Sequence, residues 1–343
     1  DMSFSVRCDR SGLEYNGTSL NTLFAQRRNL FRPSFLGMIR EILRFNREAP
    51  ALLEATNDDP SLGDYLARGR YSRAFVDNYL VPMSAAVWST PPGRMADFPA
   101  RTLIRFFKNH GFLNVDERPT WRVISGGSKS YIAPLSAPYA DRVRLSSPVT
   151  RVERKPEGVL VTTRGASEAE HFDHVVLATH SDQALRMLVD PSDAEREILG
   201  AIPYQPNRAV LHTDASVMPR TARAWASWNY HRPQQEGDAL TVTYWMNLLQ
   251  GLKTRDDYFV TLNPSAEIDP SRVLRSFDYE HPLFTREAVA AQARRAEISG
   301  VRHTSYCGAY WFYGFHEDGV RSALAVAGEL AVAGIADMAG SAA

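Results

Sequence analysis

The residues best suited to chemistry lie near the end of the chain, between His303 and Ala323. A predicted strand leads into Gly308, a loop rich in glycine and aromatic residues follows, and a helix is predicted to begin at Gly319. A helix start presents free backbone N–H groups and the positive end of the helix dipole. It can stabilise negative charge on a phosphate or on a reduced planar cofactor, and glycine lets such a group approach closely. The same pattern also suits a structural connection with aromatic core packing.

Two further segments carry related signals. Val143–Val152 contains Ser147-Pro148-Val149, and Asp173–Thr179 is an apolar run that ends in Ala178-Thr179. Each one alone predicts an ordinary strand. Their order relative to Ser125-Gly126-Gly127 and to the C-terminal segment is what makes them informative.

Together these segments resemble the flavin amine oxidase superfamily, which includes monoamine oxidases, phytoene desaturases and protoporphyrinogen oxidase. The resemblance spans nearly the whole chain and is greatest to a bacterial group of predicted NAD/FAD-binding proteins. Members of that group are often encoded beside cyclopropane fatty acid synthases. The resemblance implies FAD as the cofactor and an apolar or lipid-like substrate, with an electron acceptor that the sequence does not identify.

The resemblance also assigns residues. The cofactor-binding residues it implies are Val149, Gly308, Ala309, Asp318, Gly319 and Val320. Val149 contacts adenine through its backbone, Gly308 and Ala309 approach the ribityl or phosphate part, and the other three offer backbone contacts near the pyrimidine edge of the flavin. The aromatic side chains of Trp311, Tyr313 and Phe315 are predicted to line the substrate cavity.

Two departures from the family pattern affect the predicted activity. No G-x-G-x-x-G occurs in the sequence, so at least roughly 30 residues of a first βαβ unit are absent from it. The strand Asn207–His212 lacks the lysine that many amine oxidases place near the flavin. We therefore expect hydride transfer from a C–N or C–C bond to FAD in a longer parent enzyme, without an assigned catalytic residue. The alternative is a non-catalytic remnant that serves as a binding or scaffold module.

Composition narrows the class of protein. Lys plus Arg and Asp plus Glu each total 39, so the formal net charge is zero and no broad basic field predicts nucleic-acid binding. The short basic cluster Arg151, Arg154 and Lys155 predicts a solvated hairpin. Two cysteines and the run His316-Glu317-Asp318 lack metal-ligand spacing, so no metal is predicted. The longest apolar run is interrupted by Glu329, which favours a packed helix in a cytoplasmic protein over a membrane span.

Periodicity predicts a mixed α/β fold. It combines a Rossmann-like FAD-binding domain that lacks its first βαβ unit with a substrate domain made of an antiparallel sheet and a helical subdomain. The chain opens at Asp1 inside a predicted hairpin, as expected of an N-terminally truncated protein. The predicted regions are a hairpin at 1–18, a helical substrate subdomain at 19–112, a partial FAD-binding domain at 113–202, the antiparallel sheet at 203–300 and a C-terminal FAD-binding strand and helix at 301–343. Predicted strands include 142–145, 149–152, 159–163, 175–178 and 222–228.

Overall fold

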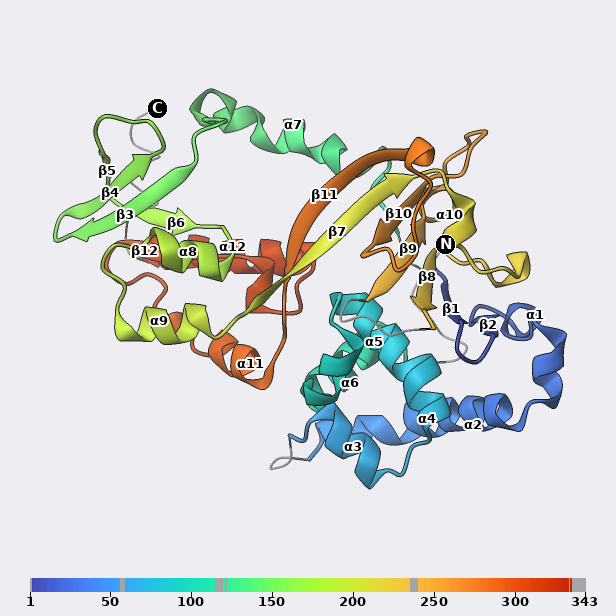
Figure 1. Cartoon of the computed structure of the whole chain (residues 1–343). Helices are drawn as coiled ribbons and strands as arrows, with labels where there is room; N and C mark the ends of the chain where they lie inside the picture. Colours follow the sequence, from blue (N-terminus) through green and yellow to red (C-terminus); the bar gives the residue numbers. More distant parts are fainter. Residues whose placement is uncertain are drawn as a thin grey trace. The chain divides into compact units, whose positions relative to one another are not determined.

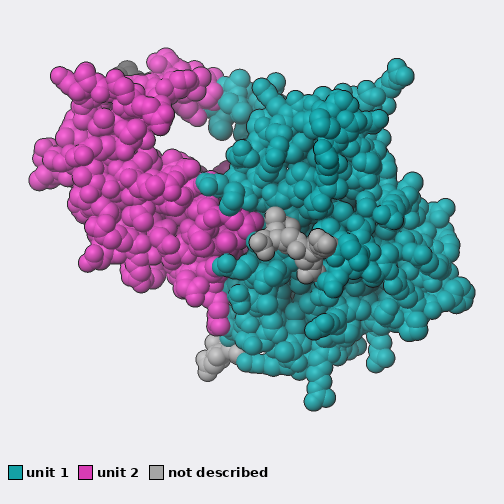
Figure 2. All heavy atoms as spheres, in the orientation of Figure 1, with its two compact units in different colours: residues 1–135, 206–281 teal, residues 136–205, 282–343 magenta. Residues whose placement is uncertain are grey.

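The fold was analysed in a computed structural model, which describes residues 2–55, 59–114, 120, 122–234, 240–332 and 334 (Figure 1). The chain divides into two compact units, each built from two separate stretches of sequence (Figure 2). Unit 1 contains residues 1–135 and 206–281, and unit 2 contains residues 136–205 and 282–343. The mixed α/β class predicted from the sequence is correct.

A sheet in the order β11-β7-β10-β9-β8-β1-β2 forms the core of unit 1. Its strands are β1 (Phe4–Cys8), β2 (Leu13–Asn16), β7 (Tyr204–His212), β8 (Trp228–Arg232), β9 (Thr241–Trp245), β10 (Phe259–Leu262) and β11 (Val273–Pro282). β7, β10, β9 and β8 pair antiparallel, as predicted. β1 and β2 form an antiparallel hairpin, and β1 then pairs parallel with β8, so the sheet is mixed.

Helices form the second part of unit 1. They are α1 (Leu20–Leu23), α2 (Pro33–Glu48), α3 (Leu62–Arg68), α4 (Arg73–Phe75), α5 (Val81–Trp88), α6 (Ala100–Asn109) and α10 (Met246–Gln250), and α7 (Ile132–Ser136) lies at the unit boundary. Pro33 starts α2 at a position where a missing N–H costs nothing, and Phe35, Met38 and Phe45 form its buried side. The Ser61 side chain accepts a hydrogen bond from the Asp64 N–H and caps α3, and serine is a favoured residue at this position.

Unit 2 contains a three-stranded sheet in the order β3-β4-β5 and a two-stranded sheet of β12 and β6. Its strands and helices are β3 (Val149–Lys155), β4 (Gly158–Thr163), β5 (Glu170–Phe172), β6 (Val175–Leu177), α8 (Ser181–Met187), α9 (Asp193–Gly200), α11 (Arg286–Gln292), β12 (Thr304–Tyr306) and α12 (His316–Val332). Ser192 caps α9 in a capping box with Glu195. Apolar side chains of both sheets and of α8, α9 and α11 share one buried core.

Two of the predicted strands are wrong. Residues 142–145 end a 3-10 helix and continue without strand pairing, and residues 222–224 form a 3-10 helix before β8 begins at Trp228. In both segments apolar and polar residues alternate, but a β-strand also needs a neighbouring strand to which it can hydrogen-bond.

Candidate functional site

The connection from β12 to α12 is tied together by backbone and side-chain hydrogen bonds. β12 pairs parallel with β6, and the Cys307 N–H extends this pairing to the Leu177 carbonyl at 3.1 Å. The Gly308 N–H then donates to the Ser322 hydroxyl at 2.8 Å, which fastens the turn to α12. A Cβ atom at Gly308 would collide with the ring of Tyr310, so this position needs glycine.

The start of α12 differs from its prediction. The helix begins at His316, three residues before Gly319, because the Asp318 carboxylate accepts hydrogen bonds from the N–H groups of Tyr313 (3.2 Å) and Phe315 (3.1 Å). Asp318 is only 5% exposed. It occupies the third helical position and reaches back to the residue before the helix, as in one half of a capping box.

This earlier start changes which backbone groups are available. The Gly319 N–H donates to the Phe315 carbonyl at 3.1 Å, so it is already used inside the helix. The open N–H groups of a helix belong to its first turn, which here means His316, Glu317 and Asp318. The Gly319 N–H is therefore not open for the backbone contact that the resemblance implies. Gly319 also has an ordinary helical φ and open space around it.

The aromatic residues of this connection differ in burial. Trp311 is 3% exposed and packs beside Tyr310, with ring centroids 5.0 Å apart, in the core of unit 2. Its side chain offers little surface to a ligand, in contrast to the predicted role in a cavity. Tyr313 and Phe315 are half-buried and keep part of their surface accessible. Val320 is 52% exposed.

An open groove of about 600 Å³ lies beside β3, β6 and α8 in unit 2. Val149 and the segment Ala178-Thr179, which the sequence singled out, both line it. The pairing of β3 with β4 shifts register between Val149 and Arg151, so the backbone is irregular at the groove. Arg164 and Arg186 also line the groove. Apolar walls with a few polar groups of this kind fit a flat heterocycle with polar substituents.

A buried charged network contacts β12 through the side chain of Tyr306. The Arg154 guanidinium donates to both oxygens of Glu195, at 2.8 and 3.0 Å, and its Nε donates to Asp190 at 2.9 Å. The Tyr306 hydroxyl donates to Glu195 at 2.6 Å. Burial by itself would raise the pKa of Glu195, but the hydrogen bonds from Arg154 and Tyr306 lower it to about 2. The predicted hairpin is present as β3 and β4, but the prediction that Arg154 is solvated in it is wrong.

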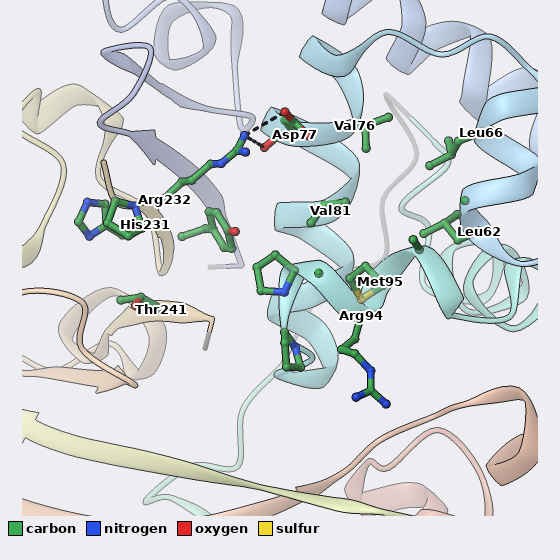
Figure 3. A pocket seen from close by; sticks show the side chains of 17 residues that line it. Leu62, Leu66, Val76, Asp77, Val81, Arg94, Met95, His231, Arg232 and Thr241 are labelled. Carbon is green, nitrogen blue, oxygen red and sulfur yellow. Dashed lines mark hydrogen bonds and ion pairs between the residues drawn. The ribbon is translucent and has the colours of Figure 1, made fainter. Parts of the chain in front are cut away.

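Unit 1 contains a pocket of about 890 Å³ that the sequence did not reveal (Figure 3). Its apolar wall comes from α3, α5, the π-helix Val76–Leu80 and the 3-10 helix Pro92–Asp97, through Leu62, Leu66, Val76, Val81 and Met95. Its polar wall comes from β8 and β9. The helical residues, between 62 and 96, and the strand residues, from 230 onward, are far apart in sequence, and no local motif links them.

The polar wall of this pocket is held by defined partners. Arg232 makes an ion pair of 3.2 Å with Asp77 (Figure 3). His231 lies 2.8 Å from an Asp9 carboxylate oxygen through Nε2 and 2.9 Å from the Ser265 hydroxyl through Nδ1. Burial lowers the pKa of His231, so a neutral imidazole donates to Asp9 and accepts from Ser265.

The chain matches the family of flavin containing amine oxidoreductases over residues 5–331 and belongs to it. Its fold is shared with cyclohexylamine oxidase from Brevibacterium oxydans IH-35A, with TM-score 0.62 and 12% identity over 98% of this chain and 81% of that one. Putrescine oxidase bound to putrescine gives TM-score 0.60 and 14% identity over 97% and 81%. A fatty acid isomerase from P. acnes that produces CLA gives TM-score 0.55 and 14% identity over 93% and 78%. No curated protein matches the chain.

The family implies a flavin, and the residues of unit 2 fit parts of one. The groove beside Val149 suits an adenine-sized ring, and the first turn of α12 offers N–H donors to negative charge. The sequence contains no glycine-rich loop of the G-x-G-x-x-G type for a pyrophosphate. Among the residues that the structure describes, no cluster of His, Cys, Asp and Glu could hold a metal ion.

Proposed function

We propose that the parent protein is an FAD-dependent oxidoreductase that removes hydride from a C–N or C–C bond of an apolar, lipid-like substrate. The observation that carries the FAD assignment is the groove at Val149 and Thr179, because it joins the two segments that the resemblance, taking them together, links to the adenosine part. Flavin supplies the hydride acceptor when bound, so the protein needs to contribute position and exclusion of water.

In this proposal Val149 and the neighbouring groove hold the adenosine part. Gly308 and Ala309 let the turn after β12 approach the ribityl or phosphate part, and Asp318 keeps the first turn of α12 in place. The N–H groups of that turn then stabilise negative charge on the cofactor. The proposed donors are those of His316, Glu317 and Asp318, because the Gly319 N–H is used inside the helix.

The pocket of unit 1 is the proposed site for the apolar body of the substrate. Its leucine, valine and methionine side chains favour apolar matter and exclude water. The Asp77–Arg232 ion pair supplies a polar contact that could orient one end of the substrate. The strand Asn207–His212 supplies no lysine, so the proposal includes no lysine-dependent amine or oxygen chemistry.

The test of the cofactor assignment uses AMP as a probe of the groove, with binding measured by calorimetry. We expect Val149→Asp to weaken AMP binding at least about tenfold, because a carboxylate would face the apolar wall and the phosphate. Val301→Asp is the matched control, since Val301 is 45% exposed in the same unit and lies outside the groove. Equal AMP binding by both variants, or no binding by the unchanged protein, would remove the support for this site.

A second experiment separates the enzyme from the non-catalytic alternative. We propose that the 343-residue chain purifies without tight flavin, because it has no pyrophosphate loop. An in-frame N-terminal extension that carries a G-x-G-x-x-G should restore the flavin absorbance. Stoichiometric flavin on the 343-residue chain would contradict the proposed binding mode, and an extended chain without flavin would favour the scaffold function.

A further inference from the structure

A surface of unit 1 holds an unusual set of large apolar side chains in solvent. Phe31 is 87% exposed, Leu20 76%, Leu43 52%, Leu30 45% and Leu36 43%. They lie on α1, on the 3-10 helix Arg27–Phe31 and on α2, which follow one another along the chain (Figure 1). These five residues and the exposed arginines around them are called the α1–α2 surface. A concentration of exposed apolar side chains indicates a site that binds another molecule or a membrane.

α2 shows how the two kinds of side chain are combined. Its buried side carries Phe35, Met38 and Phe45. Leu36, Arg40, Leu43 and Arg47 are spaced by four, three and four residues, so they form one row along the helix. All four are exposed. Leucine and arginine therefore alternate along the solvent side of the helix.

The charge of the α1–α2 surface is strongly positive, although the whole chain has a net charge of zero. Residues 69–73 lie beside α2, because Arg44 donates to the Gly69 carbonyl and the Ser72 N–H donates to Glu41. Within 20–48 and 69–73 the only exposed acidic residue is Glu48. The exposed arginines there are Arg27, Arg28, Arg40, Arg47, Arg70 and Arg73. The Arg40 side chain has no hydrogen-bond or ion-pair partner among the described residues.

We propose that the α1–α2 surface docks on an anionic lipid bilayer, with Leu20 and Phe31 at the boundary between headgroups and acyl chains. Interfacial helices combine apolar side chains with arginines that reach the lipid phosphates. Arginine and aromatic side chains are also common at protein interfaces, so the residue types alone do not exclude a protein partner. The excess of exposed arginine over exposed acidic residues favours a bilayer, because anionic headgroups match a net positive charge. Arginine stems can lie along the apolar boundary while their guanidinium groups stay at the phosphates. Within the described residues no helix is long and apolar enough to cross a membrane.

The experiment is flotation of the full 343-residue chain with vesicles of phosphatidylcholine alone or mixed equally with phosphatidylglycerol. We expect binding to the mixed vesicles and little to the neutral ones. The double variant Arg40→Glu and Arg47→Glu should lower the partition coefficient about tenfold or more, because each basic residue contributes to attraction by anionic lipid. The double variant Leu20→Ser and Phe31→Ser should lower it by a similar factor through lost apolar burial.

Matched controls lie elsewhere in unit 1. Leu274 is 54% exposed on β11, and Arg223 is exposed on the 3-10 helix Ala222–Ala224. The double variant Leu274→Ser and Arg223→Glu therefore changes one leucine and one arginine outside the α1–α2 surface. This control should bind vesicles as the unchanged protein does, and circular dichroism checks that every variant is folded. Equal binding to neutral and anionic vesicles, or normal binding by either double variant of the α1–α2 surface, would overturn the proposal.

Discussion

Two arginine–glutamate pairs in unit 2 have nearly the same geometry and opposite surroundings. Arg154 and Glu195 meet through two hydrogen bonds of 2.8 and 3.0 Å, with side chains 2% and 3% exposed. Arg294 and Glu197 meet through two hydrogen bonds of 2.6 and 3.2 Å, with side chains 36% and 66% exposed. The geometry of an ion pair therefore does not show how much the pair contributes to stability. Burial decides, because a partner removed in the interior leaves a charge that water cannot reach.

Breaking the buried pair should have the largest effect. Glu195→Gln leaves the Arg154 guanidinium buried with one carboxylate partner fewer, and we expect a loss of about 3–5 kcal/mol in the free energy of unfolding. Urea denaturation measures the change. The double variant Arg154→Met and Glu195→Leu serves as its control, since removing both charges should recover much of the loss. A double variant that is less stable than Glu195→Gln would contradict this explanation.

The second-largest effect is expected from acid, which should lower the free energy of unfolding because burial holds some side chains in one charge state. Burial lowers the pKa of His174, His212 and His231 below 6.5, so the folded chain holds these residues neutral while the unfolded chain protonates them. Stability is therefore full above about pH 6.5 and falls below it, by at most about 1.4 kcal/mol per pH unit for each histidine. Glu195, with a pKa of about 2 in place of 4.5, adds a further loss as the pH falls from 4.5 toward 2.

Denaturation at a series of pH values measures this dependence. His212→Asn should reduce the slope below pH 6.5, because the His212 side chain is fully buried. His171→Asn, at an exposed position on β5, should leave the slope unchanged. Identical slopes for both variants would mean that the buried histidines are not the source of the acid sensitivity.

Tyr306→Phe tests a neutral donor to the same buried carboxylate. The substitution removes the 2.6 Å hydrogen bond to Glu195 and leaves the ring in the core. We expect a loss of about 1.5–3 kcal/mol, since hydrogen bonds to charged groups contribute more than neutral ones. Tyr279→Phe, at a residue 52% exposed, is the control and should change little. A loss as large as that of Glu195→Gln would show that packing, not the hydroxyl, is being measured.

Asp318 tests a buried carboxylate that accepts from two backbone N–H groups and lies 3.5 Å from the Arg321 guanidinium. Asp318→Ala removes the cap at the start of α12, and we expect a loss of about 0.5–2 kcal/mol in stability. Gly319→Val should change stability less, because the added side chain meets open space and φ there is not positive. Thermal unfolding of the two variants gives the comparison. The reverse order would mean that Gly319 is constrained by something that the fold of unit 2 does not explain.

The smallest effect is expected at the exposed pair. Arg294→Gln removes the contacts with Glu197 and Glu297, but all three side chains are hydrated. Exposed ion pairs contribute little to stability, and salt screens them. We expect a melting temperature indistinguishable from that of the unchanged protein. A clear decrease would break the contrast with Arg154 and Glu195.

Much of the secondary structure was predictable because its causes are local. The Ser61 and Ser192 caps, the β1–β2 hairpin and the β3–β4 hairpin depend on residues within a few positions of one another. β11 was missed because its first half, Val273-Leu274-Arg275-Ser276, does not alternate, although Phe277 and Tyr279 alternate with polar residues further on. β5 was missed because it is only three residues long.

The candidate site was predictable only in part. The strand, turn and helix around Gly308 are contiguous, so their types and order could be read from the sequence. The residue at which α12 begins was harder to predict. Acidic residues in a first helical turn, here Glu317 and Asp318, indicate a start before them, whereas Gly319 indicates a start at the glycine. The role of Asp318 depends on two hydrogen bonds to Tyr313 and Phe315 that only the folded loop brings within reach.

The sequence by itself determined the mixed α/β class, the membership of the flavin containing amine oxidoreductase family and the strand–turn–helix around Gly308. Each of these depends on periodicity, capping or residue order along the chain. Only the tertiary structure decided that Arg154 is buried, that β1 pairs with β8, and that residues between 62 and 96 line a pocket together with residues 230–233 and Thr241. Burial and long-range pairing depend on segments remote in sequence, and no local pattern of side chains specifies which remote segment will cover them.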